Sequence, residues 1–141
     1  YPELKGRIVE TRMCNAFGPR QDTRKILPQI KKSIEEGYSI PLHNGGIGYR
    51  EYIYVKNIAP AIDLILEKGL GVYNITLGDG LTVNNLIAKS EGIIGKKVKT
   101  HEGHRSGMDI KYQVDGSRLL QIGWEPQYSF DQGLKEYLTG L

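Results

Sequence analysis

Residues 7–22 read RIVETRMCNAFGPRQD, and this stretch decides the fold class. From Arg7 to Cys14 apolar and polar residues alternate, which is the pattern of a half-buried β-strand. From Asn15 to Asp22 the Asn, Gly and Pro residues predict an irregular loop of the kind that ends a strand and carries function. From Thr23 to Gly37 apolar residues recur at helical spacing, with glycine as the stop signal. A strand that leads through a loop into a helix favours an α/β fold.

The same alternation of short strands and helices continues to residue 141. We expect further strands at Ile40–His43, Tyr49–Val55, Val72–Thr76 and Lys96–His101. We expect helices that begin at the capping residues Asn57, Thr82, Asp115 and Ser129, the last within a capping box. Residues 101–109 (HEGHRSGMD) are polar and glycine-rich, which predicts a loop. With no internal repeat or linker, the chain is expected to be one α/β domain, residues 1–141, with a small mixed sheet and helices.

Length and composition place the chain among ordinary soluble domains. Hydrophobic residues make up 39% and charged residues 25% of its 141 residues, and no apolar run is long enough to span a membrane. The net charge of +3 is too small and too dispersed for a nucleic-acid binder but suits an anionic small molecule. A single cysteine, Cys14, excludes an internal disulfide and fits a reducing, cytoplasmic compartment.

No stretch of the chain matches a glycine motif that binds dinucleotides. In a Gly-x-Gly-x-x-Gly loop the last glycine lets the helix pack against the strand, with the pyrophosphate at the helix N-terminus. Gly46-Ile47-Gly48 is followed by Glu51 at that position, and Gly69-Leu70-Gly71 by Asn74. The residues therefore predict no cradle for NAD in this chain, and there is no P-loop either.

Other patterns that suggest catalysis or metal binding also lack the residues or the spacing that these functions need. Tyr52 and Lys56 match Tyr-x-x-x-Lys, but on an extended strand four residues span roughly 13 Å, whereas a base pair of this kind needs both side chains on one helical face. Tyr1 and Lys5 straddle a proline at the end of the chain. His101-x-x-His104 lacks the cysteine partners of a zinc site, and Cys14 is typical of a small buried hydrophobe. We therefore expect no catalytic residue and no metal site.

Three separated segments each combine a polar or cationic side chain with residues that form loops. Asn15 places a carboxamide at the end of a strand, and Arg50 lies just inside one. Arg105 and Asp109 offer a guanidinium and a carboxylate on the polar loop. Two arginines can fork onto the oxygens of a diphosphate, and a carboxylate can accept hydrogen bonds from ribose hydroxyls. Together these side chains favour a site for a nucleoside diphosphate.

Taken in order, seven segments resemble the C-terminal half of the extended short-chain dehydrogenase/reductases that act on nucleotide sugars, the NAD-dependent epimerases and dehydratases such as the dTDP-glucose 4,6-dehydratases. The resemblance covers essentially the whole chain. The family reads Arg-Asp-Trp/Phe-Leu/Ile-Tyr/His-Val where this chain reads Arg-Glu-Tyr-Ile-Tyr-Val. Two departures are Asn57, where the family has Asp, and Met108, where some dehydratases have His. The matching segments are TRMCNAFGPRQ (11–21), KILP (25–28), IPL (40–42), YREYIYV (49–55), VYNI (72–75), RSGMD (105–109) and IGWEP (122–126).

The resemblance implies roles for individual residues. Asn15, Arg50 and Arg105 would contact the diphosphate of a nucleoside-diphosphate sugar. Lys25 and Leu27 would border the nucleotide, and Asp109 would reach the nucleoside. The residues that would line the nicotinamide side of the cofactor site are Met13 and Cys14.

The resemblance begins after the family's NAD-binding half and its catalytic Tyr-x-x-x-Lys helix, and the chain begins with Tyr1 rather than Met. We therefore expect the substrate-binding portion of an epimerase or dehydratase that is not catalytic by itself. The parent enzyme uses NAD or NADP, and this chain is expected to bind neither alone. The alternative is a non-catalytic interaction or regulatory module built on the same scaffold.

The missing half has a consequence for the strand at Arg7–Cys14. Its outer edge and its apolar residues, Ile8, Val9 and Met13, are expected to face solvent, and an open edge is a template for another chain. We expect a homo-oligomer, or a partner chain that carries the N-terminal half.

Overall fold

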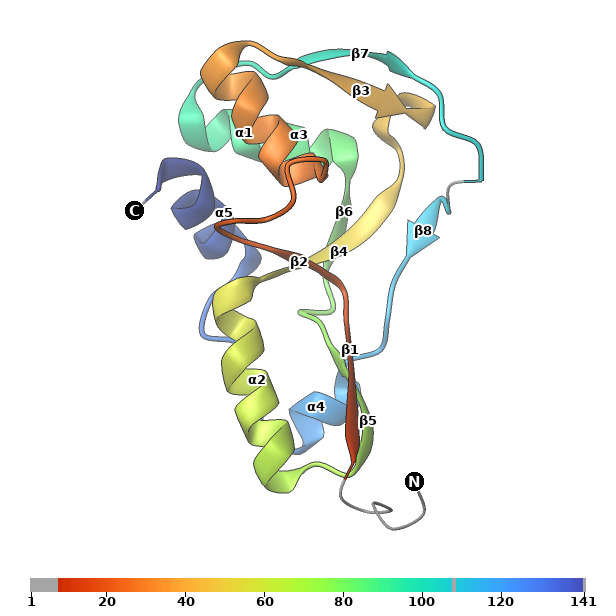
Figure 1. Cartoon of the computed structure of the whole chain (residues 1–141), viewed down its shortest axis with the longest axis vertical. Helices are drawn as coiled ribbons and strands as arrows, with labels where there is room; N and C mark the ends of the chain where they lie inside the picture. Colours follow the sequence, from red (N-terminus) through yellow and green to blue (C-terminus); the bar gives the residue numbers. More distant parts are fainter. Residues whose placement is uncertain (1–7, 108, 141) are drawn as a thin grey trace.

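The computed structural model describes residues 8–107 and 109–140, so Tyr1, Lys5, Arg7 and Met108 lie outside the described residues. Helices and short strands alternate along the chain (Figure 1), as the sequence predicts. In order, they are β1 (Val9–Met13), β2 (Asn15–Phe17), α1 (Ile26–Glu36), β3 (Ser39–His43), the 3₁₀ turn η2 (Asn44–Gly46), β4 (Tyr49–Tyr54), α2 (Val55–Lys68), β5 (Gly71–Ile75), β6 (Gly80–Thr82), α3 (Val83–Ile94), β7 (Lys99–Gly103), β8 (Lys111–Tyr112), α4 (Ser117–Gln121) and α5 (Phe130–Thr139).

The strands of the described chain form a four-stranded mixed sheet and two parallel pairs rather than one sheet. In the mixed sheet, β4 is parallel to β2 and β8 and antiparallel to β6. One parallel pair joins β1 to β5, and the other joins β3 to β7. Each parallel pair needs a long crossover between its strands, which explains the helices between them.

The mixed sheet and the helices α1, α3 and α5 enclose the larger core. Phe17 of β2 is 1% exposed and packs against Tyr54, Phe130 and Tyr137, with ring centroids 5.3 to 6.1 Å apart. Gly133 lets α5 lie this close to β4, because a Cβ there would stand 2.6 Å from Tyr54 Cβ. The larger core therefore fixes the strands that carry Asn15 and Arg50.

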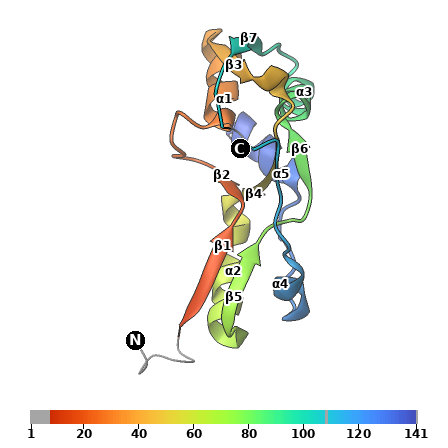
Figure 2. The same ribbon diagram turned by 90° about the vertical axis from the view of Figure 1, so that its right-hand side faces the viewer.

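A second core lies under β1 and β5, which α2 covers on one face (Figures 1 and 2). Ile53, Ile65, Tyr73, Ile75, Leu119 and Trp124 are buried there. Ile8 and Met13 remain 54% and 40% exposed, and Val9 is partly buried. The predicted exposure of apolar residues along β1 is thus confirmed for Ile8 and Met13 and only partial for Val9.

The buried carboxylate of Glu51 connects the two cores through hydrogen bonds. Glu51 is fully buried, and its Oε2 accepts hydrogen bonds from the Thr76 hydroxyl at 2.7 Å and from the Val114 amide at 3.3 Å. Thr76 follows β5, and Val114 precedes α4. One side chain of β4 therefore holds the end of the β1–β5 pair in place.

Three local predictions need correction. Asn57 does not cap α2, since the helix begins at Val55; it is buried and exchanges two hydrogen bonds with the backbone of Tyr128. Asp115 does not cap α4 either, since Gly116 takes the cap position and Asp115 accepts a hydrogen bond from the Ser117 amide just before the helix. The predicted loop at 101–109 is shorter, because residues 101–103 complete β7 by pairing with β3.

The remaining helix signals are confirmed. The Thr82 side chain accepts from the Asn85 amide at the start of α3, and Ser129 and Gln132 form the predicted capping box of α5. None of the described helices is long and apolar enough to cross a membrane.

Candidate functional site

Arg50, the second residue of β4, is held by backbone carbonyl groups. Its Nη1 donates to the Tyr49 carbonyl at 2.7 Å, and its Nη2 donates to the Asp109 carbonyl at 2.8 Å. Since β8 pairs with the same part of β4, the loop before β8 is tied to this guanidinium. No described carboxylate forms an ion pair with Arg50, so its positive charge is oriented without being neutralised.

Asn15 lies where the strand that pairs with one edge of β4 changes from β8 to β2. The Tyr49 amide points to β8, where it donates to the Ile110 carbonyl at 2.7 Å. Backbone groups two residues apart on a strand point to the same edge, so Glu51 faces this edge too. The Asn15 Nδ2 donates to the Glu51 carbonyl at 2.9 Å. The carboxamide is therefore fixed between β8 and β2, next to Arg50.

A cavity of about 400 Å³ opens beside these two side chains. It gathers residues from β2, from the start of α1 and from β4, which lie far apart in the sequence. Five of the eight predicted site residues line it, namely Cys14, Asn15, Lys25, Leu27 and Arg50. The Asn15 carboxamide and the Arg50 guanidinium thus lie around one cavity.

Arg105 lines a neighbouring cavity of about 230 Å³. The two cavities share Lys25, Ile26 and Val83, so they are adjacent rather than separate sites. His43 and Pro41 of β3 also line the smaller one. Lys25 therefore stands between Arg50 on one side and Arg105 on the other.

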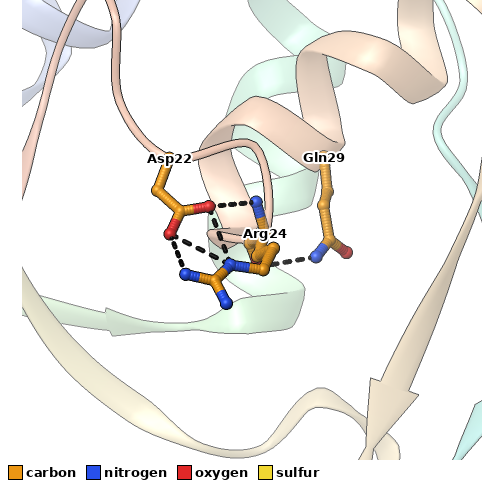
Figure 3. A network of polar contacts seen from close by, with 3 residues as sticks. All are labelled: Asp22, Arg24 and Gln29. Atoms are coloured by element: carbon orange, nitrogen blue, oxygen red, sulfur yellow. Dashed lines mark hydrogen bonds and ion pairs between the residues drawn. The ribbon is translucent and has the colours of Figure 1, made fainter.

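Arg24 also lines the smaller cavity, but its charge is compensated. Asp22 accepts hydrogen bonds from the Arg24 backbone amide and from its guanidinium, at 2.7 to 3.1 Å (Figure 3). These bonds lower the pKa of Asp22 to about 2. Gln29 donates to the Arg24 carbonyl at 2.7 Å and completes the network. Among the residues that the structure describes, the cations around the two cavities without an ion-pair partner are consequently Lys25, Arg50 and Arg105.

The remaining predicted residues are not all brought to the cavities. Cys14 is buried at the wall of the larger one, and burial raises the pKa of its thiol to about 11, so it is a neutral group. Met13 lines neither of the two cavities. Asp109 is exposed and lines neither as well; its contribution is the backbone carbonyl that Arg50 contacts.

The arrangement does not provide a tyrosine base. Tyr52 is buried in the wall of the larger cavity, and this burial raises its pKa to about 12, although Arg50 opposes the shift. Lys56 lies in α2 and pairs with Glu136. The Tyr-x-x-x-Lys pattern at Tyr52 and Lys56 therefore has no activated phenol.

The described residues also do not form a cradle for NAD or a metal site. β4 passes directly into α2 at Val55, and β6 passes into α3 behind Thr82, so neither junction has the glycine-rich turn that receives a pyrophosphate. The described part of the chain has no cluster of three or more His, Cys, Asp or Glu side chains that could hold a metal ion.

Tyr52, Gln21 and His43 are among the cavity residues that the sequence analysis did not assign to the site. Tyr52 could have been found, because strand residues two apart share a face and Arg50 was already a candidate. Gln21 closes the loop after β2; its Nε2 donates to the Ala16 carbonyl at 2.7 Å, while its Oε1 is buried without a partner among the described residues. Gln21 and His43 reach the cavities only through the packing of α1 and β3, which leaves no local signal.

Comparison with known proteins shows the family and the fold. The model of the NAD dependent epimerase/dehydratase family matches residues 3–76. The low-salt glycan biosynthesis protein Agl12 of Haloferax volcanii is 36% identical over 132 residues, which are 89% of this chain and 42% of that protein. The crystal structure of dTDP-glucose 4,6-dehydratase from Bacillus anthracis in complex with NAD superposes with a TM-score of 0.86 and 30% identity, over 93% of this chain and 43% of the other.

A second solved structure carries a nucleotide sugar. The UDP-glucose 4-epimerase of Thermotoga maritima with UDP-glucose superposes with a TM-score of 0.83 and 30% identity, over 93% of this chain and 44% of the other. The chain therefore spans about two-fifths of the length of the relatives that it matches.

Proposed function

The chain belongs to the NAD dependent epimerase/dehydratase family, and from this premise we propose that it is the substrate-binding portion of a nucleotide-sugar epimerase or dehydratase. The observation that carries the proposal is the convergence of Asn15, Lys25 and Arg50 on one cavity, with Arg105 across a shared wall. Cations and a carboxamide around adjoining hollows are the groups that recognise a diphosphate linked to two larger moieties.

The orientation of the polar groups supports a diphosphate ligand. The Arg50 guanidinium is aligned by two carbonyls, and Asn15 by one, so little side-chain freedom is lost when an anion binds. Lys25 lies at the junction of the cavities, where it can contact phosphate from either side. We assign the diphosphate to Asn15, Arg50 and Arg105.

The apolar walls suit the groups on either side of the diphosphate. Leu27 and Tyr52 are 1% and 4% exposed and give the larger cavity a rigid lining. Lys25 and Leu27 are assigned to the border of the nucleotide, and Asp109 to the nucleoside. Asp109 would reach it only after a movement of its loop, because its side chain lines neither cavity.

We propose further that the chain binds without turnover. Neither a glycine-rich cofactor loop nor an activated tyrosine is found in the described residues, so NAD or NADP is assigned to the parent enzyme, with Met13 and Cys14 on the nicotinamide side. Two relatives support these ligands, since one solved structure holds NAD and another UDP-glucose.

The single buried Cys14 supports a reducing, cytoplasmic location. The chain would act with a second copy or with a chain that carries the N-terminal half.

Calorimetric titration with UDP, dTDP and GDP sugars tests the proposal. Two arginine–phosphate contacts at about 1.5–3 kcal/mol each, less the entropy of association, predict weak but saturable binding on the millimolar-to-molar side. Arg50→Ala or Arg105→Ala should weaken binding about 10- to 100-fold, whereas Arg12→Ala, which removes the same charge from β1, should not. The absence of heat with all three sugars would favour the alternative, a non-catalytic interaction module.

A further inference from the structure

Arg50 and Glu51 are neighbours on β4, and their side chains point to opposite faces of the sheet, because successive side chains of a strand alternate. Arg50 lines the larger cavity together with Tyr52, the next residue on its own face. Glu51 is fully buried on the other face, where Ile53 belongs to the second core. The carboxylate therefore cannot touch a ligand in the cavity, and it can act on binding only through its neighbours.

Glu51 is connected to Asn15 by two routes. Its backbone carbonyl accepts a hydrogen bond from the Asn15 Nδ2 at 2.9 Å. Its carboxylate accepts from the hydroxyl of Thr76, which directly follows β5, at 2.7 Å. The last residue of β5, Ile75, accepts from the Cys14 amide at 3.2 Å, one residue before Asn15. Glu51 thus fixes both the carboxamide and the backbone next to it.

Glu51 is also connected to the group that orients the Arg50 guanidinium. Residues 109–114 lie alongside β4 and contain β8, which is two residues long and pairs only with β4 among the described strands. Before β8, the Asp109 carbonyl accepts from the Arg50 Nη2 at 2.8 Å. After β8, the Val114 amide donates to the Glu51 carboxylate at 3.3 Å. Because so short a strand has few hydrogen bonds of its own, the Glu51 carboxylate anchors the segment that holds the guanidinium.

We infer that Glu51 is a positioning residue, which holds the Arg50 guanidinium and the Asn15 carboxamide in their binding orientation from the buried face of β4. The inference rests on the proposed function for the identity of the ligand, whereas the orientation belongs to the chain itself. A group that is already oriented loses less freedom when an anion binds. Removal of the carboxylate should therefore weaken binding although no contact with the ligand is lost.

The ¹⁵N relaxation of the Arg50 Nε–H group measures this orientation directly. In the parent chain its order parameter should be about 0.8, close to that of a rigid backbone. In Glu51→Met, which keeps the length of the side chain but accepts no comparable hydrogen bond, it should fall below about 0.6. Glu51→Gln retains an acceptor oxygen and should restore the parent value. Ile65→Val loosens the same core without removing any of these hydrogen bonds and should leave the value unchanged.

An NMR titration with UDP-glucose separates this inference from the proposed function. Glu51→Met should raise the dissociation constant about three- to tenfold, whereas Glu51→Gln and Ile65→Val should stay within about twofold of the parent chain. The absence of binding by the parent chain would overturn the proposed function, and the order parameter would still decide the role of Glu51. An order parameter that stays unchanged in Glu51→Met, or that falls equally in Ile65→Val, would overturn the inference. An unchanged dissociation constant in Glu51→Met would overturn it as well.

Hydrogen exchange in the parent chain provides a test that needs no variant, should circular dichroism show that Glu51→Met is unfolded. Val114 lies outside the strands, yet its amide should exchange as slowly as the Tyr49 amide, which donates to Ile110 of the same segment. A Val114 amide that exchanges without protection would overturn the inference.

Discussion

The two cores of this chain differ in how many of the strand edges in their sheets have pairing partners. In the larger core, β4 has pairing partners on both edges, and α1, α3 and α5 pack around it. In the smaller core, β1 and β5 pair only with each other among the described residues. The fixed polar groups of the cavities, Asn15 and Arg50, belong to the closed sheet, and the exposed apolar residues Ile8 and Met13 belong to the open one. The polar side chains of the first region are thus held in a set geometry by hydrogen bonds, whereas the second region leaves apolar side chains exposed.

The largest expected difference between the regions comes from truncating one apolar residue in each. Phe17→Ala removes a ring that contacts three other aromatic rings, and should lower the free energy of unfolding by about 3–5 kcal/mol. Met13→Ala on β1 should cost below about 1 kcal/mol, because its side chain is already 40% exposed. Urea unfolding followed by circular dichroism measures both. Equal costs would show that the two regions are packed alike.

The next largest effect concerns the hydrogen bond from Thr76 to Glu51, which connects the two regions. Thr76→Val removes the hydroxyl that donates to the buried Glu51 and should cost about 1–3 kcal/mol. Valine keeps the volume of threonine, and Thr76→Ser, which keeps the hydroxyl but loses a methyl group, serves as the control. If the valine variant unfolds at the same urea concentration as the serine variant, Glu51 does not tie the smaller core to the larger one.

A smaller effect is expected at alkaline pH. Burial raises the pKa of Cys14 from 9.0 to about 11, so the folded chain keeps the thiol proton to higher pH than the unfolded chain does. Its contribution to stability is full below about pH 9 and is lost as the pH rises to about 11, by on the order of 1–2 kcal/mol. Cys14→Ala should flatten the fall in stability between these values, measured by urea unfolding at each pH. Tyr52 would retain a decline of its own towards its pKa of about 12.

Local signals in the sequence predicted most elements, because strand alternation and helix caps act over a few residues. Thr82 and the Ser129 capping box are examples whose hydrogen bonds lie within one helical turn. Asn57 shows the limit of such reasoning. It looks like a cap, but its carboxamide is matched to the backbone of Tyr128, 71 residues away.

In the candidate site, too, local signals reveal some residues, whereas others depend on contacts between distant segments. Arg50 and Asn15 stand out as polar residues at strand ends, yet the β2–β4 pairing that brings them together is not visible in either segment. Glu51 reads as an ordinary charged residue of a half-buried strand, and its burial depends on Thr76 and Val114 from two other segments. Residues 101–103 were expected in a loop because they are polar, and only their pairing with β3 makes them a strand.

Asn15, Arg50 and Arg105 are proposed to surround one diphosphate. Two-dimensional ¹H–¹⁵N NMR of the whole chain, titrated with UDP-glucose, observes the Asn15 side-chain amide and the Arg50 and Arg105 Nε–H groups directly. We predict saturable shifts of all three with one common dissociation constant, and their loss in Arg50→Ala but not in Arg12→Ala. Shifts confined to other surfaces, or three different dissociation constants, would contradict a shared diphosphate site.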